Sequence, residues 1–413
     1  MKKGRPYMGS GMQRPATFRR VLIGVALMAT LPACTMTPRI PFTAQEQALA
    51  EIPGIPDARF WPDADAASTI AARYAHEVRG PIRYLALSGG GGDGAFGAGV
   101  LRGWSETGTR PQFTLVSGVS TGALIAPFAF LGSAYDGVLK DMYTGGYGIT
   151  LVDNPDPVST LFGDGVFDSD RLLRLARQFV TRDVIAAVAA EHRKGRRLLI
   201  QTTNLDAQRP VVWNMGAIAA SGVPGSDELF RRVMVASASI PGIFTPTMIP
   251  VTGGGRSFRE MHVDGGVVSN VFILPAQMLY AQPRVSVKQG GSIYILNNGK
   301  LDPSFEVVQK SIPDIVGRSL STMVASGSRT TLSATYNFAR KNGLTFHLTA
   351  IPPEVDNSGT MAFDTDELRK LYAFGLEYGR SGHAWSSEPP AVQSDIAFRP
   401  AGPAAVAALR PGR

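Results

Sequence analysis

Short apolar runs typical of buried strands alternate with helical patterns through most of this 413-residue chain. The strand-like runs lie at residues 84–87, 114–116, 198–202, 262–263, 292–296 and 345–349. Helical periodicity separates several of them, at residues 172–179, 182–190, 314–325 and 366–378. Alternation of this kind favours a mostly parallel sheet with helices on both faces. The sequence therefore predicts an α/β fold of three layers, α/β/α.

A serine lies between two glycines where one predicted strand meets the next helix. Residues 113–117 are apolar and β-prone, residues 123–126 suit a helix, and Gly118-Val119-Ser120-Thr121-Gly122 joins them. A nucleophile elbow requires that context. The glycines suit a tight turn in which a Cβ atom would crowd the backbone, and a helix N-terminus favours negative charge at the serine oxygen. The spacing alone is also met by ordinary glycine-rich turns.

A second glycine-rich segment, containing Gly89, Gly90, Gly91, Gly92 and Gly94, follows a strand-like run and precedes a small-residue helix. Consecutive glycine amides can bind a phosphate or stabilise an oxyanion, so the loop alone leaves both roles open. Residues 92–97 also fit the dinucleotide fingerprint G-x-G-x-x-G. The acidic residue expected about twenty positions later is missing, which disfavours a dinucleotide cofactor.

An aspartate ends the strand-like segment 260–264 and is followed by two glycines, Gly265 and Gly266. Paired glycines let the Asp264 carboxylate approach another backbone closely. An Asp-Gly turn is by itself more typical of a hairpin. Taken together with the serine elbow and the glycine loop, Asp264 becomes the candidate base.

These motifs, in this order, resemble the patatin-like phospholipases, serine lipid acyl hydrolases that use a Ser-Asp dyad without histidine. The corresponding segments are the oxyanion loop at 87–94 with the helix at 99–101, the elbow at 118–122, the Ser-Ala-Pro segment at 235–246, and the aspartate turn at 264–266 with Asn270. The resemblance covers residues 81–296 well and continues more loosely to Gly379, where residues 363–379 are similar to the terminal helix. One departure is Asp93, which stands where the family usually has a basic residue and cannot donate as Arg or Lys would.

The resemblance implies a patatin-like three-layer fold and a hydrolase that needs no cofactor. Ser120 would attack an ester carbonyl, Asp264 would accept its proton, and the glycine amides would hold the oxyanion until water releases the acyl-enzyme. Because the reference pKa of aspartate is about 3.9, we expect burial to raise the pKa of Asp264 toward the working pH. Phospholipids, lysophospholipids and other esters all remain open as substrates.

Two alternatives stay in view. An α/β-hydrolase triad would use a downstream histidine, and His347 and His383 qualify by chain order. His347 alternates with apolar neighbours as a strand residue does, and His383 lies in a glycine-serine stretch. The other alternative is a non-catalytic envelope lipoprotein that keeps the fold as a binding scaffold; the presence of both Ser120 and Asp264 favours an enzyme. The five histidines show no metal-ligand spacing.

Residues 1–33 predict a bacterial lipoprotein signal peptide. Six basic residues precede an apolar run at 21–31, which ends in Leu31-Pro32-Ala33-Cys34. The run is too short for a comfortable transmembrane helix. Cys34 is the only cysteine in the chain, and its place in a lipobox-like motif predicts lipidation and attachment to a membrane surface. By resemblance to bacterial lipoproteins, Thr35 in place of an aspartate favours the outer membrane of the cell envelope.

The leader also carries much of the net charge of +8. Without its six basic residues, 35 basic residues face 33 acidic ones, a balance of +2. No basic helix or aromatic-basic cluster occurs in the remainder, so nucleic-acid binding is not expected.

Composition divides the rest of the chain into three segments. Residues 34–80 contain several prolines and predict a tether and packing arm with a short helix near 66–78, and residues 81–385 form the predicted domain. Residues 386–413 are a Pro/Ala-rich tail that we expect to be disordered. Within the domain, residues 143–170 have no clear period. This stretch predicts either a mobile flap that admits an acyl chain or a surface loop with apolar anchors at 161–162 and 166–167. The oligomeric state stays open.

Overall fold

The structure, a computed structural model, describes residue 1 and residues 39–63, 81–152, 165–281, 290–303, 305, 307–355 and 363–390. From Pro41 onward the chain forms one compact unit; of the other unit, Met1–Ile40, only Met1, Arg39 and Ile40 are described. The predicted signal peptide, Cys34, the expected helix at 66–78, the apolar pair at 161–162 and residues 391–413 lie outside the described residues.

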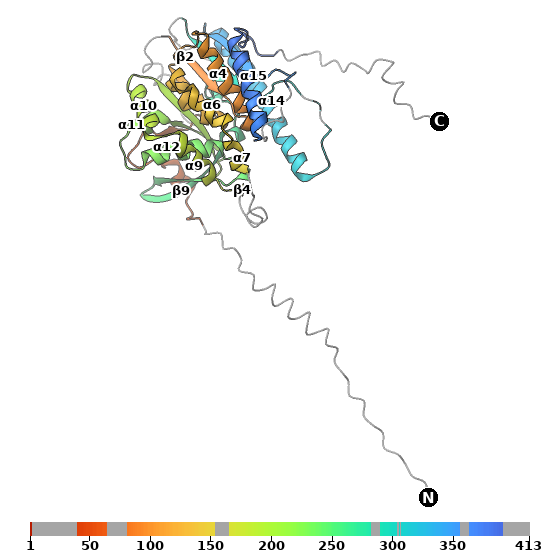
Figure 1. The fold of residues 1–413 in the computed structure, drawn as a ribbon. Helices are drawn as coiled ribbons and strands as arrows, with labels where there is room; N and C mark the ends of the chain where they lie inside the picture. Colours follow the sequence, from red (N-terminus) through yellow and green to blue (C-terminus); the bar gives the residue numbers. More distant parts are fainter. Residues whose placement is uncertain are drawn as a thin grey trace. The chain divides into compact units, whose positions relative to one another are not determined.

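A nine-stranded mixed sheet forms the centre of the described part of the chain (Figure 1). Its main path runs β1 (Arg59–Phe60), β6 (Arg209–Asn214), β5 (Arg197–Asn204), β3 (Leu115–Gly118), β2 (Arg83–Leu87), β10 (Ser292–Asn297) and β11 (Thr345–Ala350). The five strands from β5 to β11 are parallel, whereas β6 and β1 are antiparallel to their neighbours. The antiparallel pair β8 (Thr247–Gly253) and β9 (Arg256–Asp264) joins through β9 to β5. The predicted α/β fold with a largely parallel sheet is confirmed.

Helices precede and follow the strands as the periodicity predicted. They are α2 (Ala44–Ala48), α4 (Gly94–Glu106), α5 (Thr121–Leu131), α6 (Asp136–Thr144), α7 (Tyr147–Val152), α9 (Asp170–Phe179), α10 (Arg182–Arg193), α11 (Met215–Ala220), α12 (Ser226–Ala238), α13 (Ala276–Ala281), α14 (Ile312–Lys341) and α15 (Thr365–Arg380), with 3-10 turns η1 (Gly91–Asp93), η2 (Ser133–Tyr135) and η3 (Gly265–Val267). A second, two-stranded sheet pairs β4 (Gly165–Phe167) with β7 (Gly242–Phe244).

Alternate residues of β2 enter two different cores, because successive side chains of a strand point to opposite faces of the sheet. Leu85 and Leu87 belong to the larger core, together with residues of α4, α5 and α12. Tyr84 and Ala86 belong to a second core that includes Leu332 of α14. Helices therefore cover both faces of the sheet, which gives the three layers expected from the sequence.

Helices α4 and α15 approach each other closely through glycines. A Cβ atom on Gly99 would overlap the backbone oxygen of Tyr372, and one on Gly375 would overlap the backbone oxygen of Phe96. This contact joins the helix that follows the glycine loop to the terminal helix predicted at residues 363–379. The glycine of the segment at 99–101 thus has a packing role.

Segments on either side of the predicted domain also join the compact unit. Residues 39–63 add β1 beside β6, and Ala50, Ile52 and Ala58 enter the larger core. At the other end, Ser386 exchanges two backbone hydrogen bonds of 2.8 Å with Leu348 of β11. Both segments therefore pack against the domain predicted at residues 81–385.

Candidate active site

Ser120 lies in the turn between β3 and α5 with a φ of 53°, one of two positive φ angles among the described non-glycine residues. Positive φ costs energy for a residue with a side chain and is found where surrounding structure enforces it. Both flanking glycines are needed sterically. A Cβ atom on Gly118 would overlap the backbone oxygen of Gly122, and one on Gly122 would overlap the backbone oxygens of residues 87 and 88. The elbow expected from the sequence is present in the structure.

The C-terminal end of α12 supports both the serine and the aspartate. The Ser237 hydroxyl accepts a 3.0 Å hydrogen bond from the Ser120 amide and donates at 2.6 Å to the backbone oxygen of Gln201. Two residues later, the backbone oxygen of Ser239 accepts a 2.9 Å hydrogen bond from the Asp264 amide. The segment at 235–246, for which the sequence indicated only a resemblance to the Ser-Ala-Pro motif, therefore holds both the serine elbow and the aspartate turn in place.

Asp264 ends β9 with its carboxyl group buried. Oδ1 accepts a 2.7 Å hydrogen bond from the Gly266 amide, while Oδ2 has no hydrogen-bond partner among the described residues. Burial raises the pKa of Asp264 to about 7, and the Ser120 hydroxyl beside the carboxyl group and the Gly266 amide act in the opposite direction. A carboxylate with this pKa and an unoccupied lone pair can take a proton near neutral pH.

The glycine loop lies against the serine. Gly91 and Gly92 line the same pocket as Ser120, and the Gly89 amide donates a 2.8 Å hydrogen bond to the backbone oxygen of Asn270. The amides of the next three residues, at 90–92, donate none of the hydrogen bonds found among the described residues. They remain available to an oxyanion. Asp93, whose effect on the loop was an open question, is buried at the start of α4.

Two asparagines support the glycine loop through hydrogen bonds. Asn298, just after β10, donates from its backbone amide to the Ser88 hydroxyl at 2.7 Å and from its side chain to the Ser88 backbone oxygen at 2.8 Å. Asn270 donates from its side chain to the hydroxyl of Ser328 on α14 at 3.3 Å. Sequence reasoning missed Asn298, although polar residues directly after a buried parallel strand are a recognisable signal, since ligand sites gather at the carboxyl ends of such strands.

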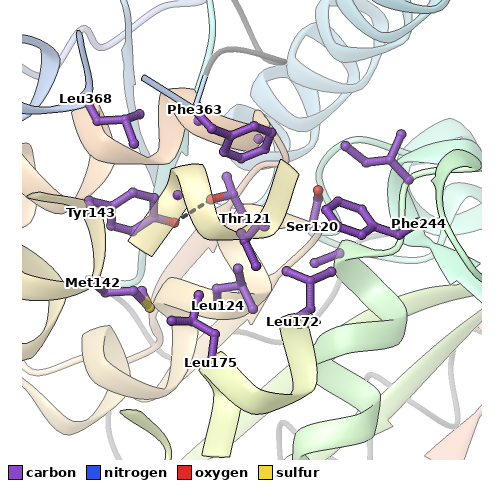
Figure 2. A pocket seen from close by; sticks show the side chains of 16 residues that line it. Ser120, Thr121, Leu124, Met142, Tyr143, Leu172, Leu175, Phe244, Phe363 and Leu368 are labelled. Atoms are coloured by element: carbon purple, nitrogen blue, oxygen red, sulfur yellow. Dashed lines mark hydrogen bonds between the residues drawn. The ribbon is translucent and has the colours of Figure 1, made fainter. Parts of the chain in front are cut away.

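An apolar pocket opens beside Ser120 (Figure 2). Helices α5, α6, α7, α9 and α15 and the end of α12 supply most of its walls, which include Leu124, Met142, Leu151, Leu172, Leu175, Ala238, Ile240, Phe244, Phe363 and Leu368. Its few polar groups include Thr121 and Tyr143, whose hydroxyls are hydrogen-bonded to each other. The pocket thus offers an apolar wall to a chain that starts at the serine oxygen.

Part of the stretch expected to be a flap or an anchored loop borders this pocket. Helix α7 contributes Gly148 and Leu151 to the lining. Beyond the undescribed residues, β4 pairs with β7, and the Phe167 ring lies 6.2 Å from the Phe244 ring.

None of the described histidines lines the Ser120 pocket. His347 lies in β11 with its ring stacked on Tyr294 at 4.4 Å, and His383 is exposed after α15. His262 is fully buried in a separate network. The geometry of the described residues gives no support to a histidine triad.

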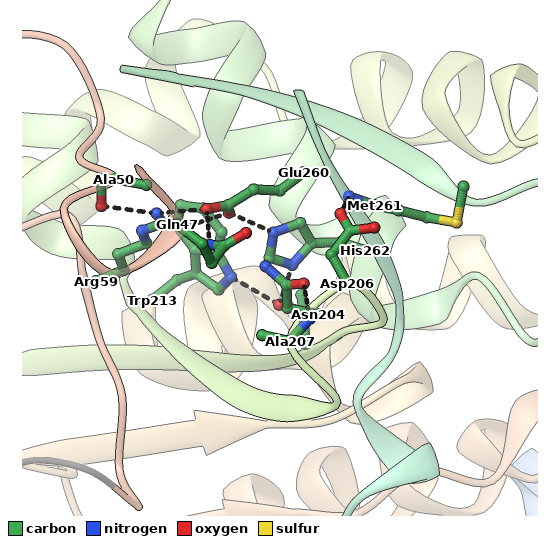
Figure 3. A network of polar contacts seen from close by, with 11 residues as sticks. Gln47, Ala50, Arg59, Asn204, Asp206, Ala207, Trp213, Glu260, Met261 and His262 are labelled. Carbon is green, nitrogen blue, oxygen red and sulfur yellow. Dashed lines mark hydrogen bonds and ion pairs between the residues drawn. The ribbon is translucent and has the colours of Figure 1, made fainter. Parts of the chain in front are cut away.

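That network joins the N-terminal segment to β9 (Figure 3). Arg59 forms an ion pair with the fully buried carboxylate of Glu260, to which Gln47 also donates. His262 contacts Glu260 at 3.0 Å and Thr202 at 2.9 Å. Burial alone would raise the pKa of Glu260, but the hydrogen bonds from His262 and Arg59 lower it to about 2. The network anchors the strand that ends at Asp264.

No cluster of His, Cys, Asp and Glu suited to a metal ion occurs within the described ranges. Over the same ranges, no helix has both the length and the apolar character needed to cross a bilayer.

A mixed α/β fold with a serine elbow beside a glycine-rich loop is typical of serine hydrolases. Comparison with protein families narrows this class, because residues 85–277 match the family model described as patatin-like phospholipase. Residues 85–277 are therefore similar to the patatin-like phospholipases, as the four motifs predicted, and this similarity supports lipid hydrolase activity.

Two solved structures are similar at 13% sequence identity. VipD from Legionella pneumophila matches over 74% of this chain and 68% of its own, with a TM-score of 0.32. The type III effector protein ExoU matches over 73% of this chain and 52% of its own, with a TM-score of 0.28, so this chain spans about half of that protein. No curated protein matches the chain.

Proposed function

We propose that this protein is a serine lipid acyl hydrolase that cleaves carboxylic esters through a Ser120-Asp264 dyad and an acyl-enzyme. The observation that carries the proposal is the position of Ser120: it lies on a strained elbow beside a buried carboxyl group whose pKa is raised to about 7. The match of residues 85–277 to a phospholipase family supports the lipid substrate. Neither step of the proposed chemistry requires a cofactor.

In the first half of the reaction, the Asp264 carboxylate takes the Ser120 proton as Oγ forms a bond to the ester carbonyl carbon. The carbonyl electrons move to oxygen, and the free amides of the glycine loop at residues 90–92 stabilise that charge. The C–O bond to the leaving group then breaks, and the leaving alcohol takes the proton from Asp264. In the second half, water repeats these steps with the acyl group on Ser120 and releases a fatty acid.

The pocket supports an acyl chain as the group that is transferred to the serine. Its walls are mainly aliphatic and aromatic side chains, and Ser120, Gly91 and Gly92 line the same pocket. An apolar chain gains free energy there at about 25 cal/mol per Å² of surface removed from water. Phospholipids, lysophospholipids and other long-chain esters fit this description.

We further propose that the mature chain is a bacterial envelope lipoprotein held at a membrane surface, with outer-membrane placement favoured, through a lipid on Cys34. The support is the leader pattern and the single cysteine at its end. Metabolic labelling with a radioactive fatty acid should mark the wild-type chain and leave Cys34→Ser unlabelled. Equal labelling of both would remove the anchor from the proposal.

The direct test of the hydrolase is release of fatty acid from phospholipid vesicles by the full chain. Ser120→Ala and Asp264→Asn should each reduce the rate by at least about a thousand-fold, the scale typical for loss of a catalytic nucleophile or base. His347→Ala and His383→Ala serve as matched controls and should retain activity. Full activity of Asp264→Asn, or loss of activity in both histidine variants, would contradict the dyad.

A binding scaffold without catalysis is the alternative from another class. It would have no use for a positive φ at Ser120, which costs about 1–3 kcal/mol, or for a buried carboxyl oxygen without a partner. A folded wild-type protein that releases no fatty acid from any phospholipid or short ester would favour the scaffold.

A further inference from the structure

The first half of α14 carries large apolar side chains that the fold leaves uncovered. Ile315, Val316, Leu320, Met323 and Val324 are 36–69% exposed. Phe305 and Val307, shortly before the helix, are 93% and 71% exposed. We call these seven residues the α14 patch. Single exposed hydrophobic residues need no explanation, but a group of seven within twenty residues of sequence marks a surface for interaction.

The patch continues a helix face that is buried further along the same helix. Eighteen residues, or five helical turns, separate Leu320 from Phe338 and Val316 from Ala334, so each pair lies on one side of the helix. Phe338 is buried and Ala334 packs against the same small core, in contact with α13. In the first half of α14, the side chains of the same apolar face are exposed to solvent. Figure 1 shows the beginning of α14, in cyan, set apart from the neighbouring helices.

Contacts of α14 connect the patch to the candidate active site. Ser328, one turn beyond Val324, bonds to the Asn270 side chain, and the Asn270 backbone holds Gly89 of the glycine loop. Val267 and Val268, which directly follow the Asp264 turn, are 51% and 44% exposed. The patch is therefore linked to the glycine loop through Ser328 and Asn270, and exposed apolar residues also follow the Asp264 turn.

We propose that the α14 patch inserts into the surface of a lipid bilayer and presents the Ser120 pocket to its substrate. The inference rests on the proposed lipid substrate. Between Ile315 and Ser328 the only charged residue is Arg318, a cation. Over the whole stretch 305–324, two acidic residues, Glu306 and Asp314, are matched by two basic ones, Lys310 and Arg318, so no net negative charge opposes the lipid phosphates. Among the apolar residues of the helix, Ser319, Ser321, Thr322 and Ser326 supply hydroxyl groups and the other positions are glycine or alanine, which gives the mixed apolar and polar surface of an interfacial helix. Seven side chains also fall short of the roughly 20–30 residues per partner in a standard protein interface, which disfavours a second copy.

The test places an environment-sensitive fluorophore at Met323→Cys in the full chain with Cys34→Ser, so that the label has one attachment site and no lipid anchor contributes. Leu49→Cys, exposed by 58% on the N-terminal segment, is the matched control site. With phosphatidylcholine and phosphatidylglycerol vesicles, the label at position 323 should shift to the blue and the label at position 49 should not. An unchanged spectrum at 323 with vesicle-bound protein would overturn the proposal, as would a shift that follows protein concentration without vesicles.

Two further measurements separate this proposal from the proposed function. In a Ser120→Ala background the spectral shift at position 323 should persist, because insertion does not need turnover. In the active protein, Leu320→Ser with Met323→Ser should lower the rate on vesicles by roughly ten-fold and leave the rate on a soluble short-chain ester unchanged, since both substitutions replace apolar side chains of the α14 patch, which gain free energy on leaving water, by hydroxyl groups. Equal loss on both substrates would contradict a surface role.

Discussion

The Ser237 hydroxyl accepts a hydrogen bond from the Ser120 amide at 3.0 Å and thereby helps to hold the positive φ of the elbow. We expect Ser237→Ala to leave this amide and the Gln201 oxygen without their partner, at a cost of about 1–3 kcal/mol. The kcat on a soluble ester should fall by roughly ten-fold or more, with a smaller change in KM. Ser239→Ala is the control, because its backbone oxygen still holds Asp264. Equal kcat values for the two variants would show that the Ser237 bond does not position the nucleophile.

The glycine after the serine should tolerate no side chain. In Gly122→Ala the new Cβ atom would overlap the backbone oxygens of residues 87 and 88, which cannot move without displacing β2. Unfolding in urea should show a loss on the order of 2–4 kcal/mol. Gly137→Ala in α6 meets no atom within 4 Å and should be neutral or stabilise the helix by up to about 1 kcal/mol. Similar stability of the two variants would be inconsistent with the packing described for the elbow.

Activity should depend on the ionisation of Asp264. Its pKa of about 7 means that the carboxylate needed as a base becomes populated only as the pH rises through that value. We therefore expect kcat/KM on a soluble ester to rise with pH around 7 and to level off above it. A profile that is flat from pH 5 to pH 9 would remove Asp264 from the role of base.

The same pKa has a consequence for stability. The folded pKa of about 7 lies above the ordinary aspartate pKa of 3.8, so the stability associated with the neutral carboxyl group is present at low pH and lost as the pH rises toward 7. Asp264→Asn keeps a neutral group at every pH. Its Tm should exceed that of the wild type at pH 8, and the difference should shrink toward pH 4. A lower Tm at pH 8 would contradict the buried environment of this residue.

The buried ion pair of Arg59 and Glu260 should respond to pH in the opposite direction. The pKa of Glu260 is lowered to about 2 from the ordinary glutamate value of 4.5, so the stability that the charged carboxylate contributes is present above pH 4.5 and is lost as the pH falls toward 2. Arg59→Met leaves a buried carboxylate unpaired and should cost about 3–5 kcal/mol at neutral pH, with a smaller cost in acid. Arg209→Met, which removes the partly exposed pair with Asp63, should cost less than about 1 kcal/mol of ion-pair energy. Denaturation curves at pH 7 and pH 3 compare the two.

The main parts of the fold could be predicted because local patterns and tertiary structure agree. Each of the six strand-like runs overlaps a strand of the sheet. The motifs of Ser120 and the glycine loop meet because each follows a parallel strand, and Leu87 of β2 pairs with Gly118 of β3. Residues placed directly after neighbouring parallel strands must come together at one edge of the sheet. Asp264 is buried because it is the last residue of β9, and this burial raises its pKa.

Other features depend on contacts between distant segments and left no local signal. Glu260 is a charged residue within the nine-residue strand β9, and only the fold shows that Arg59, 201 residues earlier, neutralises it in the interior. The helix predicted at 314–325 is longer in the structure, where α14 extends to Lys341. Its second half is rich in small and hydroxyl residues, which give no clear helical pattern in the sequence. Packing on the sheet stabilises this half as a helix. β6 and β8 were not predicted, since their pairing with β5 and β9 decides their conformation.

Ser120 is proposed here as the nucleophile and Asp264 as the base that activates it. Reaction of the folded full chain with a fluorophosphonate, followed by mass spectrometry of its peptides, tests both roles. We expect one adduct on Ser120, no adduct in Ser120→Ala, and labelling slowed by orders of magnitude in Asp264→Asn. An adduct on another residue, or labelling of Asp264→Asn at the wild-type rate, would contradict this proposal.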